Sequence, residues 1–133
     1  MPSISSSLSV PLAGLLAALA ISPAVAAETG QLLKGRIAFL RCAACHGLKA
    51  GEPDKVGPNL RGAIGAAAAQ AKDFAYTNAL RRAGLRWDDA TLRRWIAAPS
   101  ELVPGTAMAY VNELGEADIE ALIAYLKSEV TKP

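Results

Sequence analysis

The strongest constraint on this 133-residue chain is a five-residue segment that holds all of its cysteine and histidine. Cys42, Cys45 and His46 lie in the sequence Cys-Ala-Ala-Cys-His, and neither residue type occurs elsewhere. A structural zinc site needs four such ligands, so one chain cannot complete it. Any chemistry of thiol or imidazole groups has to be organised around this segment.

The spacing fits the C-x-x-C-H signature for covalent attachment of a c-type haem. Two thiols on one helical turn can bond the two vinyl groups of a single porphyrin, with His46 beneath the iron as an axial ligand. A thiol–disulfide exchange pair is disfavoured, because the cysteines follow a predicted helix and a helix C-terminus disfavours a thiolate. A plain structural disulfide is a further alternative. The segment predicts one haem c, bound through Cys42 and Cys45.

The sixth position of the iron needs a second ligand or stays open. Apart from the initiator, the only methionine is Met108, in the sequence Pro104-Gly105-Thr106-Ala107-Met108. A Pro-Gly turn can present one side chain at a fixed place. A lone methionine is more often a core side chain. With a bound haem and no competing cysteine or histidine, however, we expect Met108 to ligate the iron.

The first 27 residues contain no charged side chain. An apolar run from Leu8 to Ala20 is followed by small residues, which predicts a secretory signal cleaved after Ala26 or Ala27. Residues 28–133 would then form one monohaem domain in the periplasm. A retained membrane anchor is the alternative, although the run is shorter than the ~20 apolar residues of a spanning helix.

Apolar periodicity predicts a small all-α fold of about four to five helices around the haem. Helices are expected over Gln31–Ala44, over Thr77–Ala83, from a cap at Asp88 or Asp89 to just before Pro99, and over Glu116–Val130, with one or two helical turns in Ala66–Ala71. Two long loops flank the candidate ligands. Gly35, inside the first helix, indicates either close approach of another backbone or a tolerated glycine.

These residues resemble the small class I c-type cytochromes from Gly35 to Leu126. In that family, a glycine and an aromatic residue of the first helix pack on the last helix, and Gly35, Phe39 and Tyr125 match them. The segment Gly57-Pro58-Asn59-Leu60 matches the one whose proline carbonyl accepts a hydrogen bond from the axial histidine. The resemblance therefore implies that Pro58 orients His46.

The resemblance also implies a propionate-binding region. The stretch Phe74–Ala79 and the later Trp87 match it, so that Tyr76, Thr77 and Trp87 are expected to hold the haem propionates. The sequence around Met108 matches the family's ligand loop. Mitochondrial relatives ring the haem edge with lysines, and several of those positions are not lysine here.

What the resemblance implies is a one-electron carrier rather than an enzyme. Its partners would be redox proteins: a dehydrogenase or quinol-oxidising complex as donor, and an oxidase or reductase as acceptor. A dedicated cytochrome subunit of one oxidoreductase complex is the alternative, and the chain is expected to be a monomer or such a subunit. A haem peroxidase would need a distal acid–base residue, and no second histidine exists.

Charge is distributed unevenly along the chain. Residues 28–94 carry twelve basic and six acidic side chains, whereas residues 95–133 carry two and six. This split indicates either ordinary solvated faces or a dipole that orients docking. The formal net charge of +2 is too small to favour nucleic acid as a partner.

Overall fold

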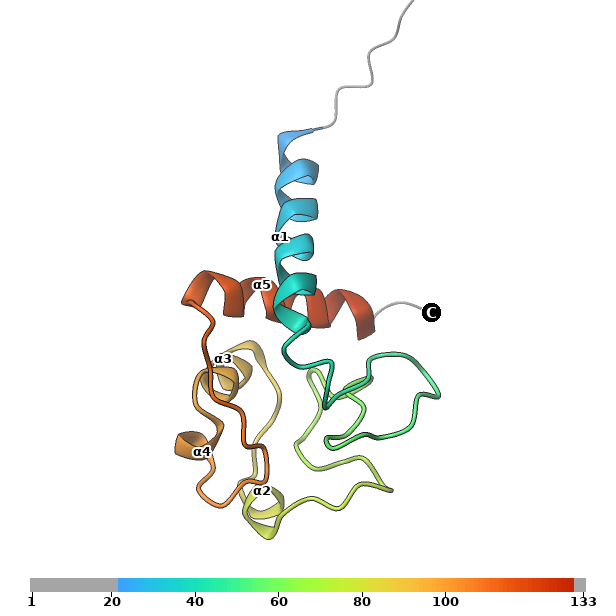
Figure 1. The fold of residues 1–133 in the computed structure, drawn as a ribbon, viewed down its shortest axis with the longest axis vertical. Coiled ribbons are helices and arrows are strands. Elements are labelled where there is room, and N and C mark those ends of the chain that lie inside the picture. Colours follow the sequence, from blue (N-terminus) through green and yellow to red (C-terminus); the bar gives the residue numbers. More distant parts are fainter. Residues whose placement is uncertain (1–21, 131–133) are drawn as a thin grey trace, which may run out of the picture.

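The computed structural model describes residues 22–130 (Figure 1). The helices are α1 (Pro23–Phe39), α2 (Asn78–Arg82), α3 (Asp89–Ala97), α4 (Pro99–Leu102) and α5 (Glu116–Val130). Within residues 22–130 no strand is formed, which agrees with the predicted all-α class. None of the helices in this part of the chain has the length and apolar character needed to cross a membrane.

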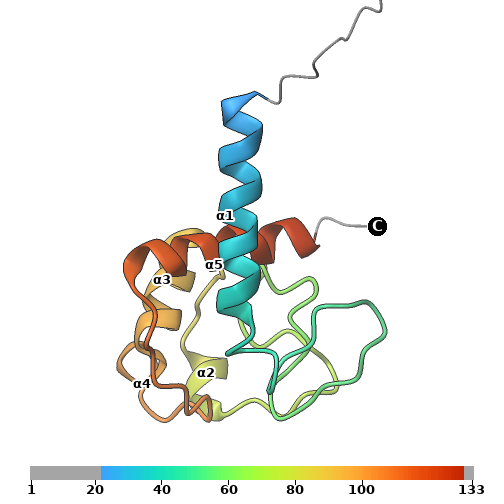
Figure 2. The same ribbon diagram turned by 45° about the horizontal axis from the view of Figure 1, so that its top comes forward.

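Helix α1 begins earlier and ends earlier than the sequence predicted. It starts at Pro23, inside the predicted signal segment, of which residues 1–21 lie outside the described residues. Residues 22–31 are exposed, and this part of α1 projects beyond the rest of the molecule (Figures 1 and 2). After Phe39 the chain continues in hydrogen-bonded turns up to Cys45 instead of regular helix.

Helices α1 and α5 cross each other (Figure 2), and their backbones approach closely at Gly35. A Cβ atom at Gly35 would overlap the Ala121 carbonyl oxygen and lie 2.6 Å from Tyr125 Cβ. The rings of Phe39 and Tyr125 pack in a tilted arrangement beside this crossing, with centroids 5.9 Å apart. The glycine is therefore required by close approach and is not merely tolerated.

The core lies where α5, α3 and the end of α1 converge. Leu122 is fully buried, and Leu92 and Ile96 of α3 pack in the same cluster. Each such side chain contributes about 1.5–3 kcal/mol by its removal from water. Helix α3 is started by Asp88, whose Oδ1 accepts a hydrogen bond from the Thr91 backbone N–H at 2.7 Å.

The segment Ala66–Ala71 is not helical, which corrects the expectation of helical turns there. Its backbone pairs instead with residues 85–87 around an antiparallel bridge between Ala67 and Arg86. The Trp87 N–H donates to the Ala66 carbonyl at 2.9 Å, and the Ala68 N–H donates to residue 85 at 2.9 Å. These groups cannot also bond within a local helix. The pairing fixes the position of Trp87.

Three ion pairs join the basic part of the chain to the acidic part. Two of them, Arg41 with Glu113 and Arg93 with Glu120, bring surplus charges of opposite sign together. In the third, Lys127 Nζ lies 2.9 Å from Asp89 Oδ2. Exposed pairs of this kind contribute about 0–1 kcal/mol each. Their main consequence is that the two parts neutralise each other locally.

Candidate functional site

The Cys-Ala-Ala-Cys-His segment forms a tight turn that continues from α1. The Cys42 N–H donates to the Phe39 carbonyl at 2.8 Å, and the His46 N–H donates to the Cys42 carbonyl at 2.9 Å. Both thiols are free and half-buried. Burial raises the pKa of the Cys42 thiol, and the nearby Cys45 raises it further. The raised pKa of Cys42 contrasts with the stabilised thiolate of an exchange enzyme.

His46 is buried and held by one hydrogen bond. Its Nδ1 donates to the Pro58 carbonyl oxygen at 2.7 Å. Because a carbonyl can only accept, the proton resides on Nδ1 and the lone pair on Nε2. Burial lowers the pKa of His46 against the opposing effect of the Pro58 bond, so the neutral ring is favoured. A neutral imidazole with a free Nε2 is the form that binds metal.

The loop after His46 folds back over the motif. The Gly57 N–H donates to the Cys45 carbonyl at 2.8 Å. The Lys55 ammonium donates to the Ala43 carbonyl at 2.8 Å and to the His46 carbonyl at 3.4 Å. These carbonyls lie at the end of a helical segment, where partners within the helix are lacking. Residues 55–58 therefore clamp the motif from outside.

Glycine at position 57 is required by the histidine ring. A Cβ atom there would lie 2.8 Å from His46 Nδ1 and would overlap Cε1. The ring thus rests directly on the Gly57 backbone. The loop itself is braced by Asn59, whose Nδ2 donates to the Lys49 carbonyl at 2.8 Å and to the Glu52 carbonyl at 3.1 Å.

Met108 is presented by a short loop after α4. The Thr106 N–H donates to the Val103 carbonyl at 3.1 Å, and Gly105 has a φ of 88°. Proline followed by a glycine with positive φ fits a type II turn. The Met108 N–H then donates to Thr106 Oγ1 at 3.3 Å. The side chain is half-buried against the cluster that contains Trp95 and Val103.

All eight predicted site residues line one cavity of about 470 Å³. Its further walls are mostly apolar and come from α1, α3, α5 and the loop before α2; they include Phe39, Leu60, Ile64, Leu92, Ile96 and Leu126. The sequence analysis named none of these as part of the site. Cys42, Cys45 and His46 come from one segment of the chain, and Met108 comes from a distant one.

The three predicted propionate-binding residues line this cavity from two segments, one with Tyr76 and Thr77 and the other with Trp87. Thr77 is the N-cap of α2, and its Oγ1 accepts from the Leu80 N–H at 3.3 Å. Tyr76 is half-buried, and burial raises the pKa of its phenol. The Trp87 ring packs on Trp95, with centroids 5.2 Å apart. The hydroxyl groups and the indole N–H are the only side-chain donors that these residues can offer a carboxylate.

Tyr110 is a cavity residue that the sequence analysis missed. It lies two positions after Met108 and lines the same cavity. Its hydroxyl donates to Asn112 Oδ1 at 3.3 Å, and burial raises the pKa of the phenol. The alternation of Met108 and Tyr110 was the available signal.

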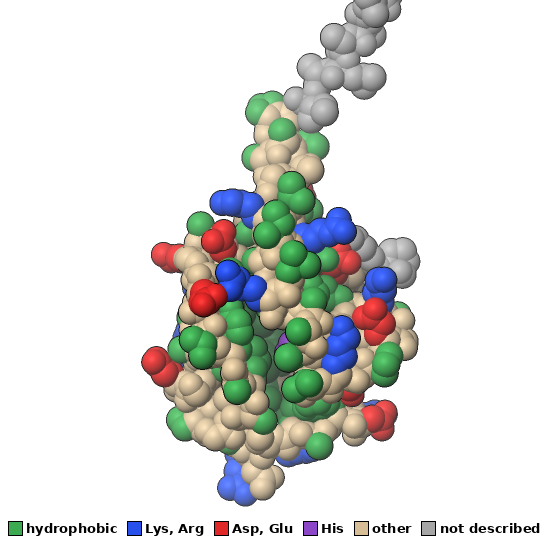
Figure 3. All heavy atoms as spheres, viewed as in Figure 1, with side chains coloured by type: hydrophobic (Ala, Val, Ile, Leu, Met, Phe, Trp, Pro, Cys, Tyr) green, Lys and Arg blue, Asp and Glu red, His purple; other side chains and the backbone are tan. Residues whose placement is uncertain are grey.

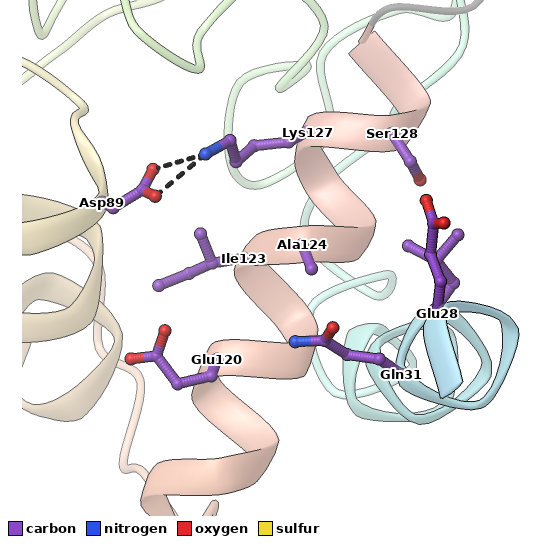
Figure 4. Close-up of a pocket in the computed structure, with 9 residues that line it drawn as sticks. Glu28, Gln31, Asp89, Glu120, Ile123, Ala124, Lys127 and Ser128 are labelled. Carbon is purple, nitrogen blue, oxygen red and sulfur yellow. Dashed lines mark hydrogen bonds and ion pairs between the residues drawn. The ribbon is translucent and has the colours of Figure 1, made fainter. Parts of the chain in front are cut away.

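A second cavity, of about 380 Å³, lies between α1, α3 and α5 (Figure 4). The Lys127–Asp89 ion pair spans part of it, and Glu28 and Glu120 also line it. It contains none of the predicted site residues.

The first cavity fits a haem better than any other group that the sequence analysis considered. Its apolar walls suit a planar macrocycle, and the two thiols lie beside it in the attachment spacing. A neutral imidazole and a thioether are the axial pair found in cytochromes c. Because Gly57 has no side chain, the histidine ring that would bind the iron has room beside it.

Comparisons with known proteins find relatives over most of the chain. The family model described as Cytochrome c matches residues 32–129. The chain is 45% identical over 92 residues to a cytochrome c2 of Rhodoblastus acidophilus, covering 69% of this chain and 86% of the relative. A cytochrome c2 of Agrobacterium tumefaciens is 41% identical over 100 residues, covering 73% and 90%. The solved structure of cytochrome cH from Methylobacterium extorquens superposes with a TM-score of 0.68 at 40% identity, covering 73% of this chain and 97% of that one.

Proposed function

The chain belongs to the cytochrome c family and is an electron-transfer protein with a covalent haem c, and we propose that it shuttles single electrons between redox proteins outside the cytoplasm. The observation that carries the proposal is the meeting of both thiols, His46 and Met108 in one apolar cavity. The haem, when bound, supplies the one-electron couple. The rest of the function depends on how the residues of the chain bind and orient that haem.

In this proposal Cys42 and Cys45 anchor the group, and His46 and Met108 are its axial ligands. The Pro58 carbonyl keeps the proton on Nδ1 and thereby leaves Nε2 free. Such a bond also raises the basicity of the ligand. The thioether of Met108 is a soft donor, and His/Met ligation raises the reduction potential.

The polar edge of the cavity has a separate role. We assign Tyr76, Thr77 and Trp87 to the propionates, because they line the cavity and offer O–H and N–H donors. Such donors are needed because burying a propionate carboxylate costs free energy unless the carboxylate is hydrogen-bonded.

Export is supported by the uncharged, apolar first segment. We propose removal of residues 1–27, a mature domain of residues 28–133 and a periplasmic location. A retained anchor predicts instead that the protein fractionates with membranes. Amino-terminal sequencing of the purified holoprotein distinguishes the two, since cleavage leaves an amino terminus at Ala27 or Glu28.

A potentiometric titration of the holoprotein tests the carrier function. A carrier gives a single reversible one-electron transition, with low-spin iron in both states and no peroxide turnover. An irreversible or high-spin transition would contradict the proposal. Co-purification with a second polypeptide at fixed stoichiometry would favour the alternative, a dedicated subunit of one oxidoreductase.

A further inference from the structure

The cavity that holds the candidate ligands opens to solvent through a nearly uncharged rim. Among its lining residues the exposed ones, here called the rim, are Arg41, Val56, Ala75, Ala107 and Ala109. Four of the five are apolar, and Val56 is 83% exposed. Figure 3 shows this hollow, with hydrophobic side chains along both of its borders.

The single cation of the rim is compensated by its own chain. Arg41 forms an ion pair with Glu113. Lys55, next to Val56, directs its ammonium group to the carbonyls of Ala43 and His46. Arg41 is therefore neutralised locally, whereas Lys55, which lies outside the rim, keeps its charge and is turned onto backbone carbonyls.

Two large, exposed apolar side chains are sequence neighbours of lining residues. Val111, which is 83% exposed, follows the lining residue Tyr110, and Leu40, which is 69% exposed, precedes Arg41. With Val56, they make up half of the six large hydrophobic side chains exposed within residues 22–130. Single exposed apolar residues are ordinary, so an interaction surface is indicated by the rim itself, where four of five residues are apolar.

We propose that the rim is the docking face for a redox protein whose own docking face is apolar and uncharged at its centre. The inference rests on the proposed function, because an electron leaves a buried cofactor where the cofactor comes nearest the surface. A charged group of the partner, whether a carboxylate or an ammonium, would lose its hydration against this rim without meeting an opposite charge. Complementarity therefore selects a neutral partner face, and association depends on apolar contact more than on electrostatic steering.

Electron self-exchange tests this directly, because a second copy of the holoprotein presents the required neutral, apolar face. One copy is oxidised as the other is reduced, so the reaction has no net driving force. The rate is measured by NMR line broadening in mixtures of the two redox states, at low and high ionic strength. We expect a wild-type rate that changes little with salt.

Val56→Lys places an uncompensated charge on the rim of both copies. Like charges brought together by docking oppose association, so self-exchange should slow by about tenfold or more at low salt and partly recover as salt screens them. Leu33→Lys is the matched control. Leu33 is 57% exposed on α1 and does not line the cavity, and its replacement should leave the rate unchanged.

Two results would overturn the docking proposal: a wild-type rate that climbs steeply with salt, or equal effects of the two lysine substitutions. Either can occur in a protein that still cycles reversibly between two redox states. Absence of a one-electron couple is a different result, since it contradicts the proposed function itself.

Discussion

The Nδ1 atom of His46 lies 2.7 Å from the Pro58 carbonyl oxygen, and the ring rests on the backbone of Gly57. These two contacts fix both the tautomer and the orientation of the imidazole. They come from one loop, which also bonds the carbonyls of the attachment motif. The ligand geometry is therefore a property of residues 55–58 as much as of His46.

Gly57→Ala should displace the histidine ring, because the new Cβ would overlap Cε1. Overpacking of this kind costs about 1–3 kcal/mol. We expect a lower free energy of unfolding, measured by denaturant titration of the holoprotein, and a smaller fraction of chains with attached haem. Gly30→Ala is the control, because nothing lies within 4 Å of its Cβ position. Equal stability of the two variants would contradict the packing argument.

Gly35→Ala should separate α1 from α5. Its Cβ would overlap the Ala121 carbonyl oxygen, which is backbone and cannot rotate away. We expect a loss of about 1–3 kcal/mol in the free energy of unfolding. Thermal unfolding followed by circular dichroism measures this loss. An unchanged midpoint would mean that the helices cross with more space than the structure has.

Lys55→Met removes the donor to two carbonyls of the attachment motif. We expect a loss of about 1 kcal/mol in the free energy of unfolding, with partial recovery in Lys55→Arg, which restores a charged donor. Lys49→Met, a change to another exposed lysine in the same loop, is the control. If both methionine variants unfold at the same denaturant concentration, Lys55 does not clamp the motif.

Glu52 makes the loop sensitive to acid. Its Oε2 accepts from the N–H groups of Leu48 and Lys49, each at 3.2 Å. The Lys49 bond, aided by the Leu48 bond, holds the pKa of Glu52 below its ordinary value of 4.5. A depressed pKa stabilises the fold above the unfolded value, and this contribution is lost as the pH falls through the folded value.

We therefore expect Glu52→Gln to reduce the acid dependence of stability. Denaturant midpoints measured from neutral pH to below pH 4.5 should fall less steeply in the variant than in the wild type. Identical slopes would show that Glu52 contributes nothing to the acid response.

The sequence predicted the elements whose signals are local. Helix α5 matches its predicted bounds, α2 lies within the predicted Thr77–Ala83, and Asp88, one of the two predicted candidates, caps α3. Periodic apolar residues and capping side chains act within a few positions of each other, so a single sequence is enough to detect them.

Features that depend on distant contacts were not predictable. The alanine run at residues 66–71 favours helix by composition, yet its backbone pairs with residues 85–87. Tertiary pairing overrides a weak local preference. The roles of Lys55 and of the Gly57 N–H depend on backbone carbonyls, which carry no sequence signal. The apolar cavity walls were not predicted as part of a site, because a protein core and a haem cavity are lined by the same types of residue.

The central claim is that His46 and Met108 are the two axial ligands of one covalently attached haem. The most direct measurement is the absorption spectrum of the oxidised and reduced holoprotein, recorded for the wild type and for Met108→Ala. We expect a low-spin wild type with the weak far-red band of a Met–ferric bond. The variant should lose that band and become open to external ligands, with the haem still attached. A Met108→Ala variant with an unchanged low-spin, six-coordinate spectrum would contradict the account.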